Sequence, residues 1–520
     1  MATTKNKQNP LIETMEIEDI SGGWNKNAYL DGKGTYDSAI GINPSYALNM
    51  QTKSSGVICP VSHTQFSSTN VTGFPLWLLT DVKDNYLYAY MSDGKYVRYS
   101  STYTGETLIG TPTSGAGNGA AYYNNCMYLA TPTDISGYMY LNGTPTLVNN
   151  LWTGSFLGSQ TALANTTYPT LIKQQIPNHP MYVHVDNTLY VGDVNANGQG
   201  QIHRVKTTTT TVQGDTNNSS AYGALLLPFG FYPTAITGYG NDLVIAAIRT
   251  SSSILDQGES ALFLWDTTSV SFYDQISLPD PLTTALLNVN GVVWIWGGNA
   301  VNGVRVSIYS GSDTITEEVY LQEGTPPFQG AVACLGNQVS WGAWTTYPTT
   351  SASVFSFDGA LHNTAVSTSN GTNQNVTAIK FAQQSSEVMP QLVMGWGNDS
   401  GYGIDALSST KAYKAVWRSD MININRSFKI NRIRFGLGDV IQAGVQIQPN
   451  VYFDDQSVQI QLDPVNTTYF QGRYVIYKVE DFGGVSAQNN FMLEFQIGGT
   501  YFMPILLPIE IEYEMFADET

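Results

Sequence analysis

The sequence predicts an all-β protein: a β-propeller of seven blades (range six to eight) between an extended N-terminal arm and a C-terminal β-sandwich of jelly-roll type. Three observations predict this. Strand-like runs return about every 50 residues between positions 56 and 410, and Gly- and Asn-rich turns join them. After position 411, strict alternation of apolar and polar residues replaces the repeat. A period of this size built from strands is typical of propellers.

The repeat is marked by an Asn, any residue, and an aliphatic residue that opens a strand. Successive copies lie 40 to 62 residues apart. A weaker copy is Pro390-Gln391-Leu392. Asn and Gly tolerate the positive φ of tight hairpins, so we expect each phrase to be a hairpin between two strands. The Asn residues are Asn85, Asn125, Asn187, Asn241, Asn290 and Asn337.

The first repeat shows the order of strands expected in each blade. Apolar runs at 76–79 and 86–90 flank the first Asn, and Asp93-Gly94 then signals a two-residue hairpin. Alternating residues at 95–99 predict a third strand and 106–109 a fourth. We therefore expect blades of four antiparallel strands over 56–410.

The two ends of the chain differ from the repeat region in composition and in the pattern of apolar residues. Residues 1–55 are polar, then rich in Gly, Asn and Tyr, and we interpret them as an extended arm that packs on a neighbouring surface. Residues 411–520 alternate cleanly, which indicates strands with one face in a core. The predicted sandwich strands are 428–435, 445–448, 451–453, 458–462, 474–477, 491–497 and 505–514.

Composition excludes several classes of protein. The net charge is −18 with only 23 Lys plus Arg, so no basic stripe is expected to bind nucleic acid. No apolar run approaches the roughly 18 residues of a membrane span. The polar start, Met1–Pro10, is unlike a signal peptide, so we expect synthesis in the cytoplasm. Three separated cysteines, Cys59, Cys126 and Cys334, are expected to be free, buried thiols.

No motif in the chain predicts catalysis, a metal or a cofactor. There is no nucleophile elbow, P-loop or HExxH pattern. Asp454-Asp455 could hold a cation, but we interpret it as a strand-ending turn. The tail with Glu510, Glu512 and Glu514 we interpret as a solvated strand edge, where charge discourages sheet pairing. The five histidines are expected to be ordinary packed or surface residues. They are His63, His179, His184, His203 and His362.

Two alternatives to a purely structural role stay open. Ser312-Asp313 and 356–359 are fragments of the box that sialidase propellers repeat, but the chain is short of the arginines such enzymes need. Aromatic residues at loop tips could stack on sugar rings, although most could equally form the core between blades. These alternatives are a carbohydrate- or receptor-binding propeller, which could take a host-surface glycan, and then a glycoside hydrolase.

The combined layout resembles structural proteins of tailed-phage virions. Residues 20–27 and 42–49 look like the entry segment of phage tail or neck proteins. An acidic propeller rich in Tyr, Thr and Asn follows, and then a terminal β-domain with Arg432-x-Arg434-Phe435 and residues 449–453. The resemblance implies a non-enzymatic ring subunit of a tail, nozzle or collar, located in the virion. Its partners would be copies of itself and other virion proteins, and the arm would dock on a neighbouring subunit.

Overall fold

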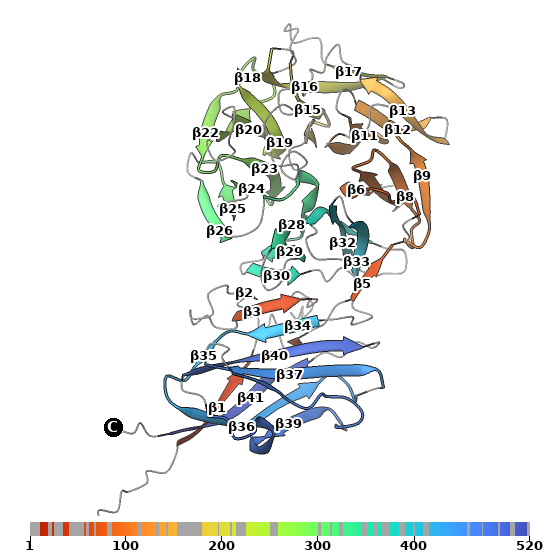
Figure 1. The fold of residues 1–520 in the computed structure, drawn as a ribbon. Coiled ribbons are helices and arrows are strands. Elements are labelled where there is room, and N and C mark those ends of the chain that lie inside the picture. The colour runs from red at the N-terminus through yellow and green to blue at the C-terminus, as the bar shows by residue number, and fades with distance from the viewer. Residues whose placement is uncertain are drawn as a thin grey trace, which may run out of the picture. The chain divides into compact units, whose positions relative to one another are not determined.

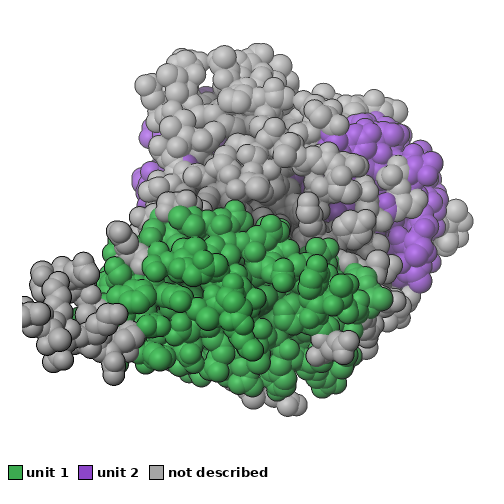
Figure 2. Space-filling model, turned by 60° about the horizontal axis from the view of Figure 1, so that its bottom comes forward, with its two compact units in different colours: residues 1–64, 355–368, 407–520 green, residues 65–354, 369–406 purple. Residues whose placement is uncertain are grey.

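The computed structural model divides the chain into two compact units (Figure 2). Unit 1 holds residues 1–64, 355–368 and 407–520, and unit 2 holds residues 65–354 and 369–406. The predicted boundaries at 55 and 410 therefore need correction, because the whole N-terminal region and a short internal segment belong with the C-terminal unit. The described residues are 11–18, 23–24, 35–40, 57–58, 62–66, 69–80, 86–112, 117, 119–131, 135–141, 144–152, 179–195, 197–208, 211–214, 225–249, 258–299, 303–312, 315–321, 326–345, 351–357, 361–365, 375–383, 390–398, 401–408, 415–441, 443–454, 458–470, 472–486, 489–499 and 505–516.

Unit 2 is a β-propeller, as predicted: antiparallel sheets follow one another along the chain and surround a common centre (Figure 1). The first four sheets are β6 (Pro75–Thr80) to β9 (Glu106–Gly110), β10 (Ala120–Tyr123) to β13 (Thr144–Trp152), β14 (Met181–Val183) to β18 (Leu225–Phe229), and β19 (Phe231–Tyr239) to β22 (Asp274–Leu278). Then come β23 (Thr283–Val289) to β26 (Thr316–Leu321), the pair β27 (Val332–Leu335) and β28 (Gln338–Thr345) followed by β29 (Ser351–Phe357), and β31 (Asn375–Ala382) to β33 (Gly401–Ser408) with β5 (Ser62–Gln65). The count of seven blades stays a prediction.

The remaining strands of these sheets follow the expected order along the chain. They are β7 (Leu87–Met91), β8 (Tyr96–Tyr99), β11 (Cys126–Ala130), β12 (Ile135–Leu141), β15 (Leu189–Val194), β16 (Gln199–Thr208), β17 (Thr211–Gly214), β20 (Asp242–Arg249), β21 (Glu259–Trp265), β24 (Val292–Asn299), β25 (Gly303–Tyr309) and β32 (Gln391–Asn398).

The recurring Asn phrase forms the hairpins between the first two strands of a sheet, which confirms the prediction. Asn125, Asn187 and Asn290 adopt φ of 59°, 58° and 54°. At two other tips the preceding Gly240 and Gly336 take the positive φ instead. Both residue types accept this left-handed backbone at low cost, so the turns set the register of each hairpin. The tip at Asn85 lies outside the described residues.

Four apolar clusters of unit 2 lie between two sheets that follow each other in the chain. One cluster joins Tyr88 and Tyr96 of the first sheet to Met127 of the second, and the next joins Tyr128 to Leu189 of the third. Further clusters continue in the same way from the third to the fourth sheet and from the fourth to the fifth. The second, third and fourth sheets are therefore covered on both faces, so their inner strands are apolar throughout rather than alternating.

The ring closes between the last sheet and the first. Phe66, Leu78 and Leu87 share one cluster with Val393 and Ile404. The Phe66 N–H donates to the Ile404 carbonyl over 2.9 Å. At the same junction the Thr377 hydroxyl donates to the Pro75 carbonyl, and a Cβ added at Gly395 would lie 2.6 Å from Pro75 Cβ.

Unit 1 contains two sheets built from both ends of the chain. The first, which we call the terminal sheet, has the order β1-β41-β36-β39, with β4 also on β41. Its strands are β1 (Leu11–Ile17), β4 (Val57–Ile58), β36 (Phe428–Leu437), β39 (Tyr474–Lys478) and β41 (Ile505–Met515). The second has the order β3-β34-β40-β37-β38. Its strands are β3 (Thr35–Ile40), β34 (Ala415–Ser419), β37 (Val445–Phe453), β38 (Val458–Gln461) and β40 (Asn490–Gly499).

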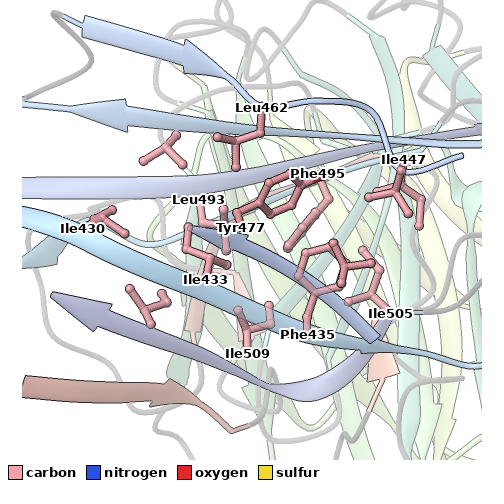
Figure 3. Close-up of a cluster of buried hydrophobic side chains, with 14 of the residues drawn as sticks. Ile430, Ile433, Phe435, Ile447, Leu462, Tyr477, Leu493, Phe495, Ile505 and Ile509 are labelled. Carbon is pink, nitrogen blue, oxygen red and sulfur yellow. The ribbon is translucent and has the colours of Figure 1, made fainter. Parts of the chain in front are cut away.

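A single apolar core lies between these two sheets. Ile433 and Ile509 of the terminal sheet point toward Ile447 and Phe495 of the second sheet (Figure 3). Alternate residues of each strand enter this core, as the period-2 pattern predicted. The two runs expected on either side of Pro449 form one strand, β37, and the jelly-roll topology stays a prediction.

Described parts of the predicted extended arm are sheet strands of unit 1, while docking of the arm on a neighbouring subunit stays a prediction. β1 pairs antiparallel with β41 from Leu11 opposite Met515 to Ile17 opposite Ile509. β3 pairs with β34, and β4 pairs with β41. The sequence could not reveal this because the pairing partners are nearly 500 residues away.

Replacing Gly395 by Ala should destabilise the propeller by about 1–3 kcal/mol, because the added methyl would overlap the rigid ring of Pro75. Gly105→Ala is the matched control, since the nearest atom to its Cβ would be 4.0 Å away. Differential scanning calorimetry should show a lower Tm for the first variant only. Equal Tm values would contradict the tight closure described here.

Candidate interaction surface

The terminal sheet presents a face to solvent on which acidic and basic side chains gather. On β41, Ile509, Ile511 and Tyr513 are buried in the core, so Glu510, Glu512 and Glu514 between them lie on the opposite face. Residues in direct cross-strand positions share a face. The register partners of these glutamates on β1 and β36, and in turn their partners on β39, therefore lie on the same face. This charged face consists of Ile12, Thr14, Glu16, Lys429, Arg432, Arg434, Tyr474, Ile476, Lys478, Glu510, Glu512 and Glu514.

Acidic and basic residues occupy separate neighbouring strands on the charged face. Arg432 Nη2 lies 3.2 Å from Glu512 Oε2, and Arg434 Nη1 lies 3.2 Å from Glu510 Oε2. Lys429 is the register partner of Glu514. The acidic column of β41 is thus held by the basic column of β36, and each half-exposed pair adds only a few tenths of a kcal/mol.

The interpretation of the acidic tail as a strand edge is wrong. β41 lies inside the terminal sheet, with β1 on one side and β36 on the other. Glu510 and Glu512 form ion pairs with Arg434 and Arg432, so they do not serve to prevent another strand from pairing with a sheet edge. The alternation predicted the face correctly, but the basic partners come from a strand about 80 residues earlier.

The two real edges of the terminal sheet carry exposed apolar side chains. At the β1 edge Leu11 is 55% and Ile12 59% exposed. At the β39 edge Tyr474 is 64% and Ile476 45% exposed. Large apolar side chains on a strand edge favour the addition of another strand.

The second sheet of unit 1 contains a buried polar network that the sequence did not reveal. Arg418 Nε donates to Glu494 Oε2 over 2.9 Å, and Asn450 Nδ2 donates to Oε1 over 3.0 Å. The Tyr452 hydroxyl and Gln496 Nε2 also donate to Oε1, over 3.1 and 2.9 Å. Burial alone would raise the pKa of Glu494, but these hydrogen bonds and the Arg418 charge hold the pKa below its usual value. Both carboxylate oxygens of Glu494 accept hydrogen bonds within the network, which suits a structural role.

The propeller brings together two histidines that the sequence showed only as scattered. His179 Nδ1 lies 3.6 Å from Asp193 Oδ1, and His203 Nε2 lies 3.3 Å from Asp193 Oδ2. Gln201 Nε2 donates to the same Oδ2 over 2.8 Å. All four side chains are buried, so this cluster belongs to the packing of unit 2 rather than to a site open to substrate.

His184 makes a separate contact with a neighbouring carboxylate. His184 Nδ1 lies 3.1 Å from Asp186 Oδ1. His63 and His362 lie in β5 and in β30 (Leu361–Ala365), and their side chains fall outside the described residues. Within the described part of the chain, no group of three or more His, Cys, Asp or Glu side chains is arranged to hold a metal ion.

Other sequence candidates also have structural positions. Asp454 ends β37 with φ of 46° and accepts a hydrogen bond from the Asn489 N–H, so the turn interpretation is confirmed for that residue, while Asp455 lies outside the described residues. Cys126 is buried, and burial raises the pKa of its thiol to about 12. Cys334 is only half-buried, which corrects its prediction, and Cys59 lies outside the described residues.

Many of the described aromatic side chains lie in the core, although Phe229 and Tyr273 of the propeller are exposed. The largest fully buried side chains are Trp265, Trp296, Trp341, Trp396, Trp417, Tyr88, Tyr90, Tyr96, Tyr99 and Tyr128. Of the sialidase-box fragments, Ser312 and residues 356–357 are described, but Asp313 and residues 358–359 are not. The described helices include none long and apolar enough to cross a membrane.

Comparisons with known proteins give similarity of fold only. No protein-family model matches the chain, and no curated protein matches it. Among solved structures, the extracellular domain of a putative hybrid two-component system from B. thetaiotaomicron is 14% identical with a TM-score of 0.43, covering 71% of this chain and 43% of that one. The present chain therefore spans less than half of that protein's length.

Two further solved structures are similar over nearly their whole length. The computationally designed Ika8 protein is 13% identical with a TM-score of 0.38, covering 66% of this chain and 99% of that one. The Cps50 (Swd1) β-propeller domain of Myceliophteria thermophila is 12% identical with a TM-score of 0.42, covering 67% and 99%. At these scores the likeness carries no functional argument.

Replacing Arg418 by Leu should destabilise unit 1 by about 3–5 kcal/mol, because Glu494 would be left as a buried charge without its cation. Replacing both residues by Leu should recover much of that loss, since no charge then remains buried. Urea denaturation of the single and double variants measures this. A double variant no more stable than Arg418→Leu would contradict the account.

Asp405 should make the propeller less stable as the pH rises. Burial raises the pKa of its carboxyl to about 6 from 3.8, against a smaller lowering by the Trp396 indole. The folded state therefore holds a proton that the unfolded chain releases above pH 4, and stability is lost between about pH 4 and 6. The loss is about 3 kcal/mol. Asp405→Asn should remove this decline in urea unfolding curves, and an unchanged pH profile would contradict it.

Proposed function

We propose that this protein is a structural component of a tailed-phage virion, a subunit that self-assembles into a ring of the tail, nozzle or collar. The observation that carries the proposal is the charged face of the terminal sheet. A chain with only 12% charged residues gathers acidic and basic columns there, beside edges with exposed Leu11, Ile12, Tyr474 and Ile476. Complementary charge and exposed apolar edges are features of surfaces that bind other proteins.

The rest of the molecule supports a mechanical role. The propeller's closed ring and the buried networks around Asp193 and Glu494 use polar side chains for packing. The resemblance of residues 20–27 and 42–49 to phage tail and neck proteins supports placement in a virion. Many of the described aromatic side chains lie in the core, which favours a structural role over sugar stacking.

Static light scattering on the purified full-length chain tests this proposal. The expected result is a defined assembly whose mass is a multiple of 56.7 kDa and which dissociates on dilution. A monomer at every concentration would overturn self-assembly. Specific retention of the monomer on immobilised glycans would then favour the receptor-binding alternative.

A further inference from the structure

Resting on the proposed self-assembly, we infer how the copies join: the β39 edge of one subunit pairs with the β1 edge of the next. The terminal sheets of neighbouring copies would then form one continuous sheet. In the strand order of the described residues, β39 pairs only with β36, and β1 pairs only with β41. Each edge strand therefore offers a row of backbone N–H and C=O groups for another strand.

The β39 edge has no Pro and only one charged residue to oppose pairing. Natural edges are guarded by charged residues, Pro or bulges. β39 reads Tyr-Val-Ile-Tyr-Lys, with only the final Lys478 charged. Val475 and Tyr477 enter the core, while Tyr474 and Ile476 are exposed. An exposed strand of aromatic and β-branched residues gains by covering its apolar side chains with a partner strand.

Strand directions fit a head-to-tail junction. β1, β41, β36 and β39 are successively antiparallel. A second copy placed beside β39 in the same orientation therefore brings its β1 antiparallel to β39. The two strands are of similar length, seven residues for β1 and five for β39.

The charges on the two edge strands favour pairing of β39 with β1 over pairing with an unrelated strand. Glu16 lies directly opposite Glu510, and Lys478 lies directly opposite Arg432. Like charges in direct cross-strand positions are unfavourable. Among the described ion pairs, Glu510 and Arg432 have partners on the neighbouring strand, whereas none includes Glu16 or Lys478. On the charged face, Glu16 at the β1 edge and Lys478 at the β39 edge thus carry charges of opposite sign.

The junction relieves both unfavourable positions at once. If the rows of the charged face continue across it, Lys478 of one copy lies opposite Thr14 of the next, with Glu16 as a diagonal neighbour within reach of its long side chain. The two edges are different surfaces, so the contact is heterologous and repeats from copy to copy. Such contacts generate closed rings or open filaments.

The test replaces Ile476 by Glu in the full-length chain and measures assembly by light scattering over a concentration series. In the register given above, Ile476 lies directly opposite Glu16 of the next copy, so the variant places two anions in direct cross-strand positions. The concentration for half-assembly should rise at least about tenfold, an amount corresponding to about 1.4 kcal/mol per contact. Val458→Glu is the matched control, because Val458 is a 41% exposed apolar residue on β38, the last strand of the other sheet, and it should assemble like the wild type.

A charge swap provides the specific readout. Lys478→Glu and Glu16→Lys should each weaken assembly, and the double variant should recover it. Circular dichroism and thermal unfolding of each dissociated variant should match the wild type. Wild-type assembly in Ile476→Glu, or no recovery in the double variant, would overturn the edge pairing while leaving self-assembly standing. A monomeric wild type would overturn both.

Discussion

The pairing of β1 with β41 is the constraint on which unit 1 depends. β41 lies between an N-terminal strand and β36, so the terminal sheet is incomplete until the last residues of the chain meet the first. The propeller has a similar requirement, because Phe66 must reach Ile404 to close the ring. Contacts this distant in sequence must overcome a large loop-closure entropy, so both units are expected to fold slowly. Once these contacts have formed, unfolding is expected to be slow as well.

Local sequence was enough to predict what depends on local geometry. The Asn phrase marked the hairpins because positive φ at Asn125, Asn187 and Asn290 is a property of the residue itself. The alternation in β36 and β41 likewise predicted which side chains enter the core. Pairing across the chain has no such local signal. The N-terminal strands carry no mark that distinguishes an arm on another subunit from a strand of their own unit.

The polar residues show the same limit at the level of single side chains. Glu494 and Glu510 occupy equivalent alternating positions on neighbouring parts of the sequence, yet Glu494 is buried under four donors and Glu510 is half-exposed beside Arg434. Only the tertiary surroundings decide which of the two glutamates is buried and which is exposed. The same holds for Asp193, whose two imidazole neighbours come from separate segments. Strand position predicts a face, and packing decides whether that face is covered.

Hydrogen–deuterium exchange in the assembled and dissociated states measures the central claim most directly. The account requires that β41 is an interior strand of each copy and that β1 and β39 are edges covered only on assembly. Amides of Ile505–Met515 should exchange slowly in both states, while those of Leu11–Ile17 and Tyr474–Lys478 should gain protection together in the assembly. Equal exchange of the two edges in both states, or fast exchange of β41 in the dissociated chain, would contradict the account.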